Sequence, residues 1–310
     1  MKCVVTGGAG FIGSHLVHRL VHDGHEVVVI DDLSTGDETR LADVRSRIVF
    51  VRHDIQDDVS GIVKPGVDVV FHLAARPRVQ FSMKEPVLTH KVNVDGTLNL
   101  LLAARDAKVK RFVFSSSSSV YGDQDVLPLS ESMAPRPMSP YAAQKWIGEQ
   151  YCGLFHALWG LPTVALRYFN VYGPGMDPNG AYACMIPKFI MLARQGKAPT
   201  IFGDGEQSRD FTFVDDVVEA NLLAATTQNS DCFGRVFNIG AQEGVSVNQV
   251  TGMILDLGHS QVKPVHLDPV VEPKHTLSDS ASAQRMLGWS PKMDIASGLR
   301  LVAESMRSAR

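Results

Sequence analysis

The chain has 310 residues, of which 45% are hydrophobic and 20% charged, values typical of a folded globular protein and unlike those of disordered or fibrous chains. Its formal net charge of −3 gives no overall attraction to nucleic acid or to an anionic membrane, so we expect neither partner. The sequence lacks an apolar run long enough for a membrane span or a signal peptide, and we expect a cytoplasmic protein. Its four cysteines form no C-x-x-C pair, which argues against a zinc cage and against a disulfide framework.

Short β-branched and aromatic runs alternate with helical patterns through the first half of the chain. The runs are apolar on both faces, as is typical of a parallel sheet covered by helices on both sides. The predicted strands cover residues 2–6, 26–30, 47–51, 68–72, 110–114 and 162–168. The predicted helices lie near 11–22, 94–107, 140–159 and 214–227, and we expect the last to begin at Asp215 or Asp216, which are good N-cap residues. This alternation predicts an α/β fold with a doubly wound parallel (Rossmann) sheet.

Beyond residue 170 the sequence changes to loops rich in proline and glycine. Further helices are predicted near 183–195, 247–257 and 280–287, and a strand at 235–239. We expect a dinucleotide-binding domain over 1–170, to which the helix and strand near 212–240 return, and a smaller α/β domain over 171–310 that mainly binds substrate.

A glycine-rich turn follows the first predicted strand. Gly8, Gly10 and Gly13 satisfy the pattern G-x-G-x-x-G between a strand and a helix. Glycines allow the backbone to approach a pyrophosphate closely, and the helix N-terminus presents unpaired N–H groups to it. The strand–turn–helix context predicts a dinucleotide site.

Three aspartates follow the second and third predicted strands. Asp31 closes the second strand, where a carboxylate can bind both ribose hydroxyls of adenosine and repel a 2′-phosphate, so NAD is favoured over NADP. Asp32 either shares this role or caps the loop. Asp54, after the third strand, is either a contact of the adenine amino group or an ordinary loop aspartate.

Tyr141 and Lys145 are four residues apart on a predicted helix and therefore share one face of it. A lysine ammonium beside a phenol stabilises phenolate, and moving a tyrosine pKa from ~10 toward 7 takes about 4 kcal/mol. The spacing alone also fits a solvated helix face. Five serines, Ser115 to Ser119, follow the buried strand at 110–114 and bring hydroxyls to the edge of the sheet where ligands bind, which favours an active site.

Motifs spread over nearly the whole chain resemble the extended short-chain dehydrogenase/reductases, specifically the UDP-galactose 4-epimerase type of nucleotide-sugar epimerase. In order, the motifs are TGGAGFIGSH, DDLSTG, HDI, HLAA, NVDGT, FSSSSSVYG, SPYAAQK, LRYFNVYGP and SRDFTFVDDV. The resemblance implies that Tyr141 is the catalytic base, that Lys145 tunes it and holds the nicotinamide ribose, and that Ser117, with help from Ser119, hydrogen-bonds the sugar 4-hydroxyl.

The same resemblance implies an NAD-dependent isomerase that inverts C4 of a UDP-hexose through a transient 4-keto sugar, the pair being UDP-GlcNAc/UDP-GalNAc, UDP-Glc/UDP-Gal or both. The expected cofactor contacts are Gly7, Gly10, Phe11, Ile12, Gly13, Asp31, Asp32, Asp54, Ile55, Leu73, Ala74, Ala75, Lys145 and Tyr168. The expected substrate contacts are Ser117, Ser119, Tyr141, Asn170, Cys184, Met185, Thr200, Phe202, Arg209, Glu272 and Thr276.

The resemblance also implies a homodimer formed through the helices near 94–107 and 140–159. Their apolar residues beyond one face are Leu98, Leu101, Leu102, Trp146, Ile147, Tyr151, Phe155 and Leu158. No metal is expected, because His18 and His22 share a helix face without the acidic partner of an H-E-x-x-H site.

Other functions on the same scaffold stay open. Related dehydratases and decarboxylases carry carboxylates where this chain has Ser118 and Ser119, which counts against both reactions. A UDP-glucuronate 4-epimerase, in which Arg76 or Arg78 receives the uronic carboxylate, or another nucleotide-sugar epimerase or reductase remains an alternative. A non-catalytic NAD-sensing binding protein is a more remote alternative function.

The C-terminal part departs from the epimerase pattern. An arginine expected near residues 268–270 is missing, so either Lys274 replaces it or the nucleotide binds more weakly, while Glu272 stands for the acidic residue. The resemblance implies that Thr276 matches a position on the C2 side of the sugar, and relatives with tyrosine there resemble glucose/galactose enzymes. Threonine leaves room there for an N-acetyl group.

Overall fold

The computed structural model describes residues 1–178, 184–269 and 273–308. A central sheet contains seven parallel strands in the order β11-β6-β5-β4-β1-β2-β3. These strands are β1 (Lys2–Thr6), β2 (Glu26–Asp31), β3 (Ile48–Arg52), β4 (Val69–His72), β5 (Arg111–Ser117), β6 (Thr163–Tyr168) and β11 (Arg235–Ile239). The strand order reverses direction between β1 and β4, which is the point where doubly wound sheets bind their ligands.

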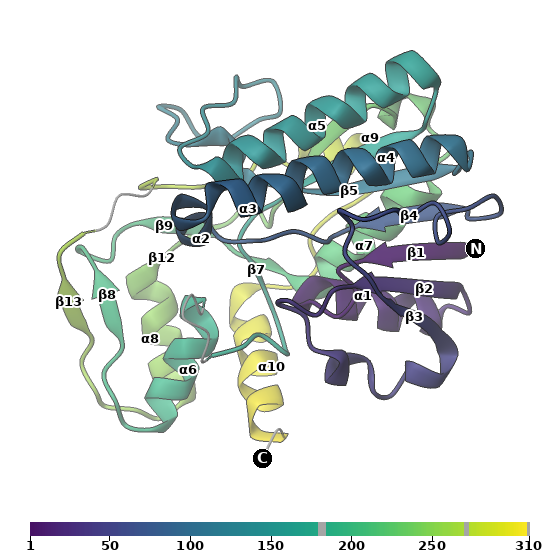
Figure 1. Cartoon of the computed structure of the whole chain (residues 1–310). Coiled ribbons are helices and arrows are strands. Elements are labelled where there is room, and N and C mark those ends of the chain that lie inside the picture. The colour runs from purple at the N-terminus through teal and green to yellow at the C-terminus, as the bar shows by residue number, and fades with distance from the viewer. Residues whose placement is uncertain (179–183, 270–272, 309–310) are drawn as a thin grey trace.

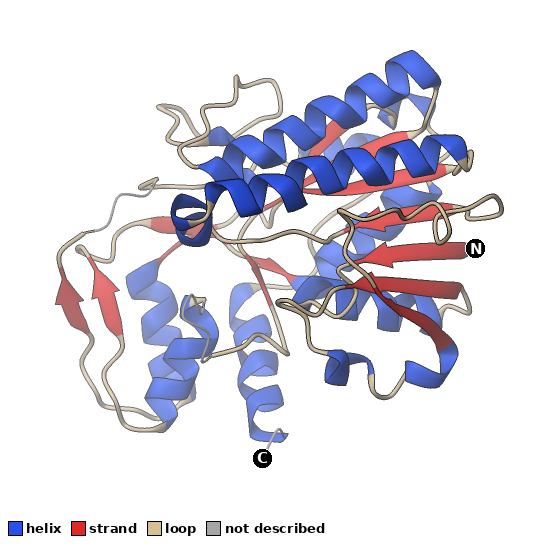
Figure 2. Ribbon diagram, viewed as in Figure 1, coloured by secondary structure: helices blue, strands red, loops and turns tan. Residues whose placement is uncertain are grey.

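Helices cover both faces of this sheet (Figures 1 and 2). One face packs against α1 (Phe11–His22), α7 (Val214–Thr226) and α9 (Ala281–Leu287), and the other against α4 (Gly96–Asp106) and α5 (Pro140–Trp159). In β4, Val69 and Phe71 join the first hydrophobic cluster and Val70 joins the second, which explains why the strand is apolar throughout.

Two residues that the sequence suggested for a subunit interface lie in the interior. Leu101 is 0% exposed and Phe155 is 2% exposed, and both belong to the cluster beneath α4 and α5. The expectation was wrong for these two because each helix turns them toward the sheet rather than outward.

A second unit lies beyond the carboxyl ends of the strands, on the side toward which their arrowheads point in Figure 1. It contains a third hydrophobic cluster, built by α6 (Met185–Arg194), α8 (Val247–Leu257) and α10 (Ile295–Ser308). Short ladders complete it: β7 (Val171–Tyr172) with β10 (Thr212–Phe213), β8 (Thr200–Phe202) with β13 (Val265–Leu267), and β9 (Ser208–Asp210) with β12 (Gly244–Ser246).

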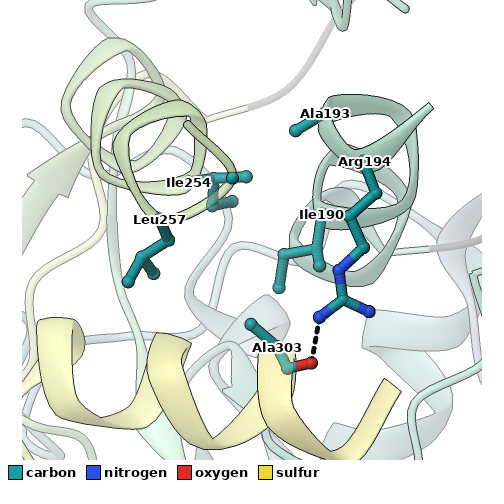
Figure 3. Close-up of a pocket in the computed structure, with 7 residues that line it drawn as sticks. Ile190, Ala193, Arg194, Ile254, Leu257 and Ala303 are labelled. Carbon is teal, nitrogen blue, oxygen red and sulfur yellow. Dashed lines mark hydrogen bonds between the residues drawn. The ribbon is translucent and has the colours of Figure 1, made fainter. Parts of the chain in front are cut away.

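A small crevice remains where α6, α8 and α10 meet (Figure 3). Its walls are mostly apolar, including Ile190 and Ile254, and the Arg194 guanidinium donates a hydrogen bond to the Ala303 carbonyl across it. The crevice lies inside the third cluster, so it is a packing feature of the second unit.

The structure differs from the sequence expectations at several helix ends. Helix α7 begins at Val214 after Phe213, not at an aspartate cap, because the Asp216 carboxylate is engaged by the backbone N–H groups of Lys292 and Met293. Helix α10 was not expected. Two short helices, α2 (Val79–Lys84) and α3 (Pro86–His90), and a π-helical turn over Lys91–Asp95 precede α4.

Among the described residues, no helix is both long and apolar enough to cross a membrane. The four cysteines are free thiols, and Cys3, Cys152 and Cys232 are buried.

Candidate active site

The glycine loop after β1 is shaped by contacts that only glycine allows. Gly7 has φ +70°, and a Cβ at this residue would lie 2.7 Å from the Ala74 backbone nitrogen. A Cβ at Gly13 would lie 2.1 Å from the Gly7 carbonyl oxygen. Gly10 precedes α1 in extended conformation and offers no side-chain cap to the helix N-terminus. The loop over residues 7–10, in which only the buried Ala9 carries a side chain, is therefore a cradle next to an uncapped helix N-terminus, which fits the pyrophosphate of a dinucleotide.

Asp31 ends β2 next to this loop and is 7% exposed. Its carboxylate accepts hydrogen bonds from the backbone N–H groups of Ala9 and Leu33, both at 2.9 Å. Burial raises the pKa of Asp31, and the two amide bonds oppose that shift. These amides fix the orientation of the carboxylate at the strand end.

Asp32 caps its own loop by accepting from the Ser34 backbone N–H at 2.9 Å, and it also pairs with Arg76 at 3.1 Å. Asp54 accepts from the backbone and the side-chain nitrogens of Gln56, at 2.9 and 2.8 Å. Both aspartates therefore stabilise their own loops, as the alternative to cofactor binding expects.

The remaining expected cofactor contacts surround the same edge of the sheet. Leu73, Ala74 and Ala75 form the partly exposed segment that follows β4. Phe11 and Ile12 open α1, and Ile55 is buried against Gly96. Tyr168 is 7% exposed, and its hydroxyl accepts from Ser115 and donates to Asn221. Its polar atom is thus already bonded within the protein.

The N-terminus of α5 carries Tyr141 and Lys145. Ser139 caps this helix by accepting from the Ala142 N–H at 3.2 Å, and Pro140 occupies the first helical position. Ser117, the last residue of β5, lies beside the Tyr141 hydroxyl and acts to lower its pKa. Strand β5 and helix α5, which are joined by a long loop, therefore meet at this pair.

Ser117 is itself held by the next turn of the chain. The Ser119 hydroxyl donates to the Ser117 hydroxyl at 2.9 Å, and the Ser119 N–H lies 3.2 Å from the same oxygen. Because its oxygen accepts these bonds, the Ser117 hydrogen is free to point toward another acceptor.

Lys145 is 4% exposed, and its Nζ donates to the Ser115 carbonyl at 2.6 Å. Nζ lies 5.0 Å from the centre of the Phe114 ring and 5.9 Å from the centre of the Tyr141 ring. Burial lowers the pKa of Lys145 to about 8, and the Glu149 carboxylate opposes this shift.

Burial raises the pKa of Tyr141 to about 12, and the bond with Ser117 opposes that shift. The sequence suggested a pKa lowered by Lys145. That expectation is wrong for the protein alone, because the lysine ammonium is bonded to Ser115 and the phenol is shielded from water.

A buried ion pair that the sequence motifs did not predict lies one helical turn beyond Lys145. Glu149 accepts from the Arg167 Nε at 2.8 Å and from its Nη2 at 2.7 Å, and Ser116 donates to the same carboxylate at 2.5 Å. The Arg167 guanidinium lies 4.6 Å from the centre of the Tyr121 ring. The spacing of Glu149 four residues after Lys145 was a visible signal, but its partner on β6 was not.

The expected substrate residues line the boundary with the second unit. Asn170 donates to the Asp210 carbonyl at 3.2 Å and lies 3.4 Å from the Thr276 hydroxyl. Arg209 donates to the carbonyl oxygens of Ser208 and Lys274, at 2.9 and 3.2 Å. Asn170, Arg209 and Thr276, which are far apart in the sequence, are therefore gathered at one place.

Other expected substrate contacts belong to separate elements of the second unit. Cys184 and Met185 begin α6, and Thr200 and Phe202 belong to β8, with Phe202 45% exposed. Glu272 lies outside the described residues.

The histidines of α1 are engaged by other groups. His15 lies 3.0 Å from the Pro174 carbonyl oxygen, and His18 lies 2.7 Å from Asp43. In the part of the chain that the structure describes, no three histidine, cysteine or acidic side chains are grouped so that they could hold a metal ion.

The sequence was compared with models of known families. The model of the NAD dependent epimerase/dehydratase family matches residues 3–240. The chain belongs to this family. The family's dependence on NAD agrees with the cradle at Gly7 to Gly13 and with the buried carboxylate of Asp31.

Relatives of this epimerase/dehydratase extend over the full chain. A UDP-glucose 4-epimerase from Mycolicibacterium smegmatis is 39% identical over 316 aligned positions and covers 99% of each chain. The solved UDP-N-acetylglucosamine 4-epimerase from Methanobrevibacter ruminantium M1, in complex with UDP-N-acetylmuramic acid, is 39% identical with a TM-score of 0.95, covering 100% of this chain and 99% of the other. The UDP-glucuronic acid 4-epimerase from Bacillus cereus, solved with UDP-glucuronic acid and NAD, is 36% identical with a TM-score of 0.90 and covers 100% of both chains.

Proposed function

We propose that this protein is a UDP-sugar 4-epimerase in which Tyr141, Ser117 and Lys145 carry the chemistry. The placement of Ser117 at the end of β5 beside Tyr141 on α5, at the sheet edge that also bears the glycine loop, is the observation that carries this proposal. A phenol beside a serine hydroxyl is suited to exchange a proton with a sugar hydroxyl bound next to both. The 4-epimerases among the relatives support the choice of reaction.

In this proposal each side chain has one task. Tyr141 removes the proton of the sugar 4-hydroxyl and later returns it, while Ser117 keeps the two oxygens in line. We assign Lys145 to holding the nicotinamide ribose, because in the protein alone its ammonium donates to the Ser115 carbonyl. NAD, when bound, takes up hydrogen from C4 as hydride and returns it, so the sugar is inverted without net oxidation.

The residues at positions 118 and 119 favour epimerisation over elimination reactions. Both are serines, and the Ser119 hydroxyl is used to hold Ser117. Dehydration or decarboxylation needs a further acid or base beside the tyrosine, and a serine hydroxyl is too weak an acid for that task.

We propose that Gly7, Gly10 and Gly13 receive the pyrophosphate of NAD and that Asp31 binds the adenosine ribose. Because the loop has glycine at every position except the buried Ala9, the N–H groups at the start of α1 are open to the phosphates. The Asp31 carboxylate still has lone pairs for two hydroxyls after it has accepted the bonds from Ala9 and Leu33.

For the substrate we propose that both N-acetylated and unsubstituted UDP-hexoses are accepted. Thr276, within 3.4 Å of Asn170, is small where a tyrosine ring would fill the space beside the sugar. Arg209 precedes Asp210, whose carbonyl accepts from Asn170, and the Arg209 side chain donates to the Lys274 carbonyl. Arg209 and Lys274 are our candidates for binding the diphosphate.

A second substrate class, the uronic acids, is favoured by one observation. Arg76 is paired with Asp32, whereas Arg78 is exposed. Burial raises the pKa of Cys184, which precedes α6, and the charge of Arg78 opposes that shift. Arg78 also has a strained backbone, with φ +90°, a type of strain that clusters at ligand sites. A carboxylate at C6 of the sugar would pair with this arginine.

The decisive experiment incubates purified protein, without added NAD, with UDP-Glc, UDP-GlcNAc and UDP-GlcA in parallel and follows inversion at C4 by proton NMR. We expect inversion of UDP-GlcNAc and UDP-Glc, with the Tyr141→Phe protein as the negative control. Inversion of UDP-GlcA alone would assign the uronate function. Loss of all turnover in protein that retains NAD would contradict the proposal and favour an NAD-sensing role.

We also propose a homodimer that forms through α4 and α5. Apolar side chains stay exposed on the outer face of these helices: Leu102, Leu154, Leu158 and Trp159. Leu154 and Leu158 are one helical turn apart and 49% and 64% exposed, which creates an apolar stripe suited to a two-fold contact.

A further inference from the structure

A chain of hydrogen bonds crosses the sheet beneath the proposed active site. It is centred on His72, the last residue of β4, which is 1% exposed. The ring Nδ1 lies 2.8 Å from the Thr6 hydroxyl at the end of β1, and the ring Nε2 lies 2.8 Å from the Thr97 hydroxyl in α4. Both threonines are buried as well.

The direction of each bond in this chain follows from the groups at its two ends. Thr97 donates its only hydroxyl hydrogen to the Asn93 carbonyl at 2.7 Å, so it must accept from the N–H of His72 Nε2. In a neutral ring Nδ1 then has no hydrogen and accepts from Thr6. The Thr6 oxygen in turn lies 3.2 Å from the Ala74 backbone N–H, which donates to it.

The imidazole is held in this neutral form by its surroundings. Burial, together with the positive charge of Lys145, lowers the pKa of His72 to about 3. The ring packs against Phe112 and Phe114, with centroid distances of 5.9 and 5.6 Å, and among the described residues no carboxylate forms a hydrogen bond with it. One tautomer, with the hydrogen on Nε2, therefore satisfies every bond.

The two ends of the chain reach two different parts of the site. At one end is Ala74, whose backbone nitrogen would be 2.7 Å from a Cβ on Gly7 and therefore forms part of the glycine cradle. At the other end is Asn93, in the π-helical turn. Its side chain accepts from the Arg76 backbone N–H at 2.7 Å and donates to the Gln144 side chain at 2.8 Å. Gln144 directly precedes Lys145 on α5.

We propose that His72, as the neutral Nε2–H tautomer, is a positioning residue that sets the cofactor-binding segment after β4 against the helix that carries Tyr141 and Lys145. It contacts neither reacting group. Its ring keeps β1 and α4 at a fixed separation, because Nδ1 can only accept from Thr6 and Nε2–H can only donate to Thr97. If the spacing changes, both the floor of the cofactor site and the placement of the catalytic helix change.

The first test reads the tautomer directly. Protein labelled with ¹⁵N-histidine is examined by two-bond ¹H–¹⁵N correlation spectra over about pH 5.5 to 7.5, and His72 is assigned by comparison with His72→Asn. We expect a ring with a protonated Nε2 and an unprotonated Nδ1 that does not titrate in this range. A ring with the hydrogen on Nδ1, or one that takes up a proton, would overturn the proposal.

The second test breaks the chain without changing shape. Thr97→Val leaves the Nε2–H without an acceptor, and we expect NAD affinity and kcat to fall by about tenfold or more while KM for the UDP-sugar changes little. Thr97→Ser keeps the hydroxyl and should restore both. NAD affinity is measured by titration, so this arm stands even if the protein acts on none of the sugars that we propose.

A matched control separates positioning from stability. Thr251 is 2% exposed in α8 and donates only to the Val247 carbonyl of its own helix, at 2.6 Å. Thr251→Val makes the same chemical change in the second unit and should lower Tm without changing NAD affinity or kcat. If Thr97→Val behaves in the same way as Thr251→Val, His72 has a structural role alone and the proposal is wrong.

Discussion

Tyr141 is the residue on which the proposed chemistry depends most directly. Replacement by phenylalanine removes the hydroxyl that meets Ser117 and keeps the ring, so the fold and NAD binding should persist. We expect epimerisation to fall by roughly 10²–10⁴ or more, the usual contribution of a positioned acid–base group. Turnover by NMR and NAD retention measured on one preparation check this. Near-normal turnover would show that another group moves the proton.

Thr276 is the residue where we expect substrate choice to be decided. Thr276→Tyr should fill the space beside Asn170 and penalise the N-acetylated sugar through overlap, by ~1–3 kcal/mol, which is about tenfold to a few hundredfold in kcat/KM. Unsubstituted UDP-Glc should lose little. Thr276→Val, which removes the hydroxyl without adding bulk, is the matched control. Equal losses for the two sugars in parallel kinetics would mean that position 276 does not gate the substrate.

The sequence predicted the residues that form motifs but not those that act through distant partners. Tyr141 and Lys145 share a helix face at a spacing that can be recognised, and Ser117 follows a buried strand. Glu149 and His72 gave weaker signals. Each is a polar residue in an apolar segment, and its meaning depends on Arg167, Thr6 or Thr97, which come close only when the sheet is assembled.

At the scale of elements, strands and long helices were predicted well because their burial leaves a pattern. The expected helices at 140–159 and 247–257 have the bounds of α5 and α8. Helix α10 was missed although Ile295, Leu299 and Val302 lie on one face and are buried. The π-helical turn over Lys91–Asp95 could not be predicted, since one extra residue in a helix leaves no distinct periodicity.

Helix α5 connects the proposed catalytic pair to the ion pair of Glu149 and Arg167, and this connection gives a prediction about pH. Because the Glu149 carboxylate favours the charged form of Lys145, Glu149→Gln should lower the Lys145 pKa further below about 8. The ammonium is then lost at lower pH. We expect the alkaline limb of the kcat/KM profile to move to lower pH. An unchanged limb would show that Lys145 does not govern it.

The same substitution leaves the Arg167 guanidinium buried without its carboxylate, a loss that typically costs about 3–5 kcal/mol. Adding Arg167→Met to Glu149→Gln removes the uncompensated charge. The double variant should therefore recover most of the free energy of unfolding, while the pKa of Lys145 stays lower than in the original protein. Denaturant unfolding of the three proteins measures this.

At the scale of the whole molecule, the exposed stripe on α5 predicts a dimer. Light scattering at micromolar concentration should give the mass of two chains. Leu154→Arg combined with Leu158→Glu should give one chain with unchanged circular dichroism, because both side chains are at the surface. Leu301→Glu on α10, where the leucine is 38% exposed, is the control and should leave the dimer intact. A monomeric original protein would refute the interface.

The course of the chain after residue 170 has a consequence for engineering. Ile186 and Phe213 belong to the third hydrophobic cluster, Val217 and Phe237 to the first, Ile254 to the third, Trp289 to the first and Leu299 to the third. Successive segments are thus interleaved between two cores. Neither unit can be excised or transplanted by cutting the chain at one place, because the remaining piece would lose part of its own interior. The substrate specificity of this protein is therefore easier to change by single substitutions at residues that line the proposed substrate site than by exchanging one unit for that of another protein.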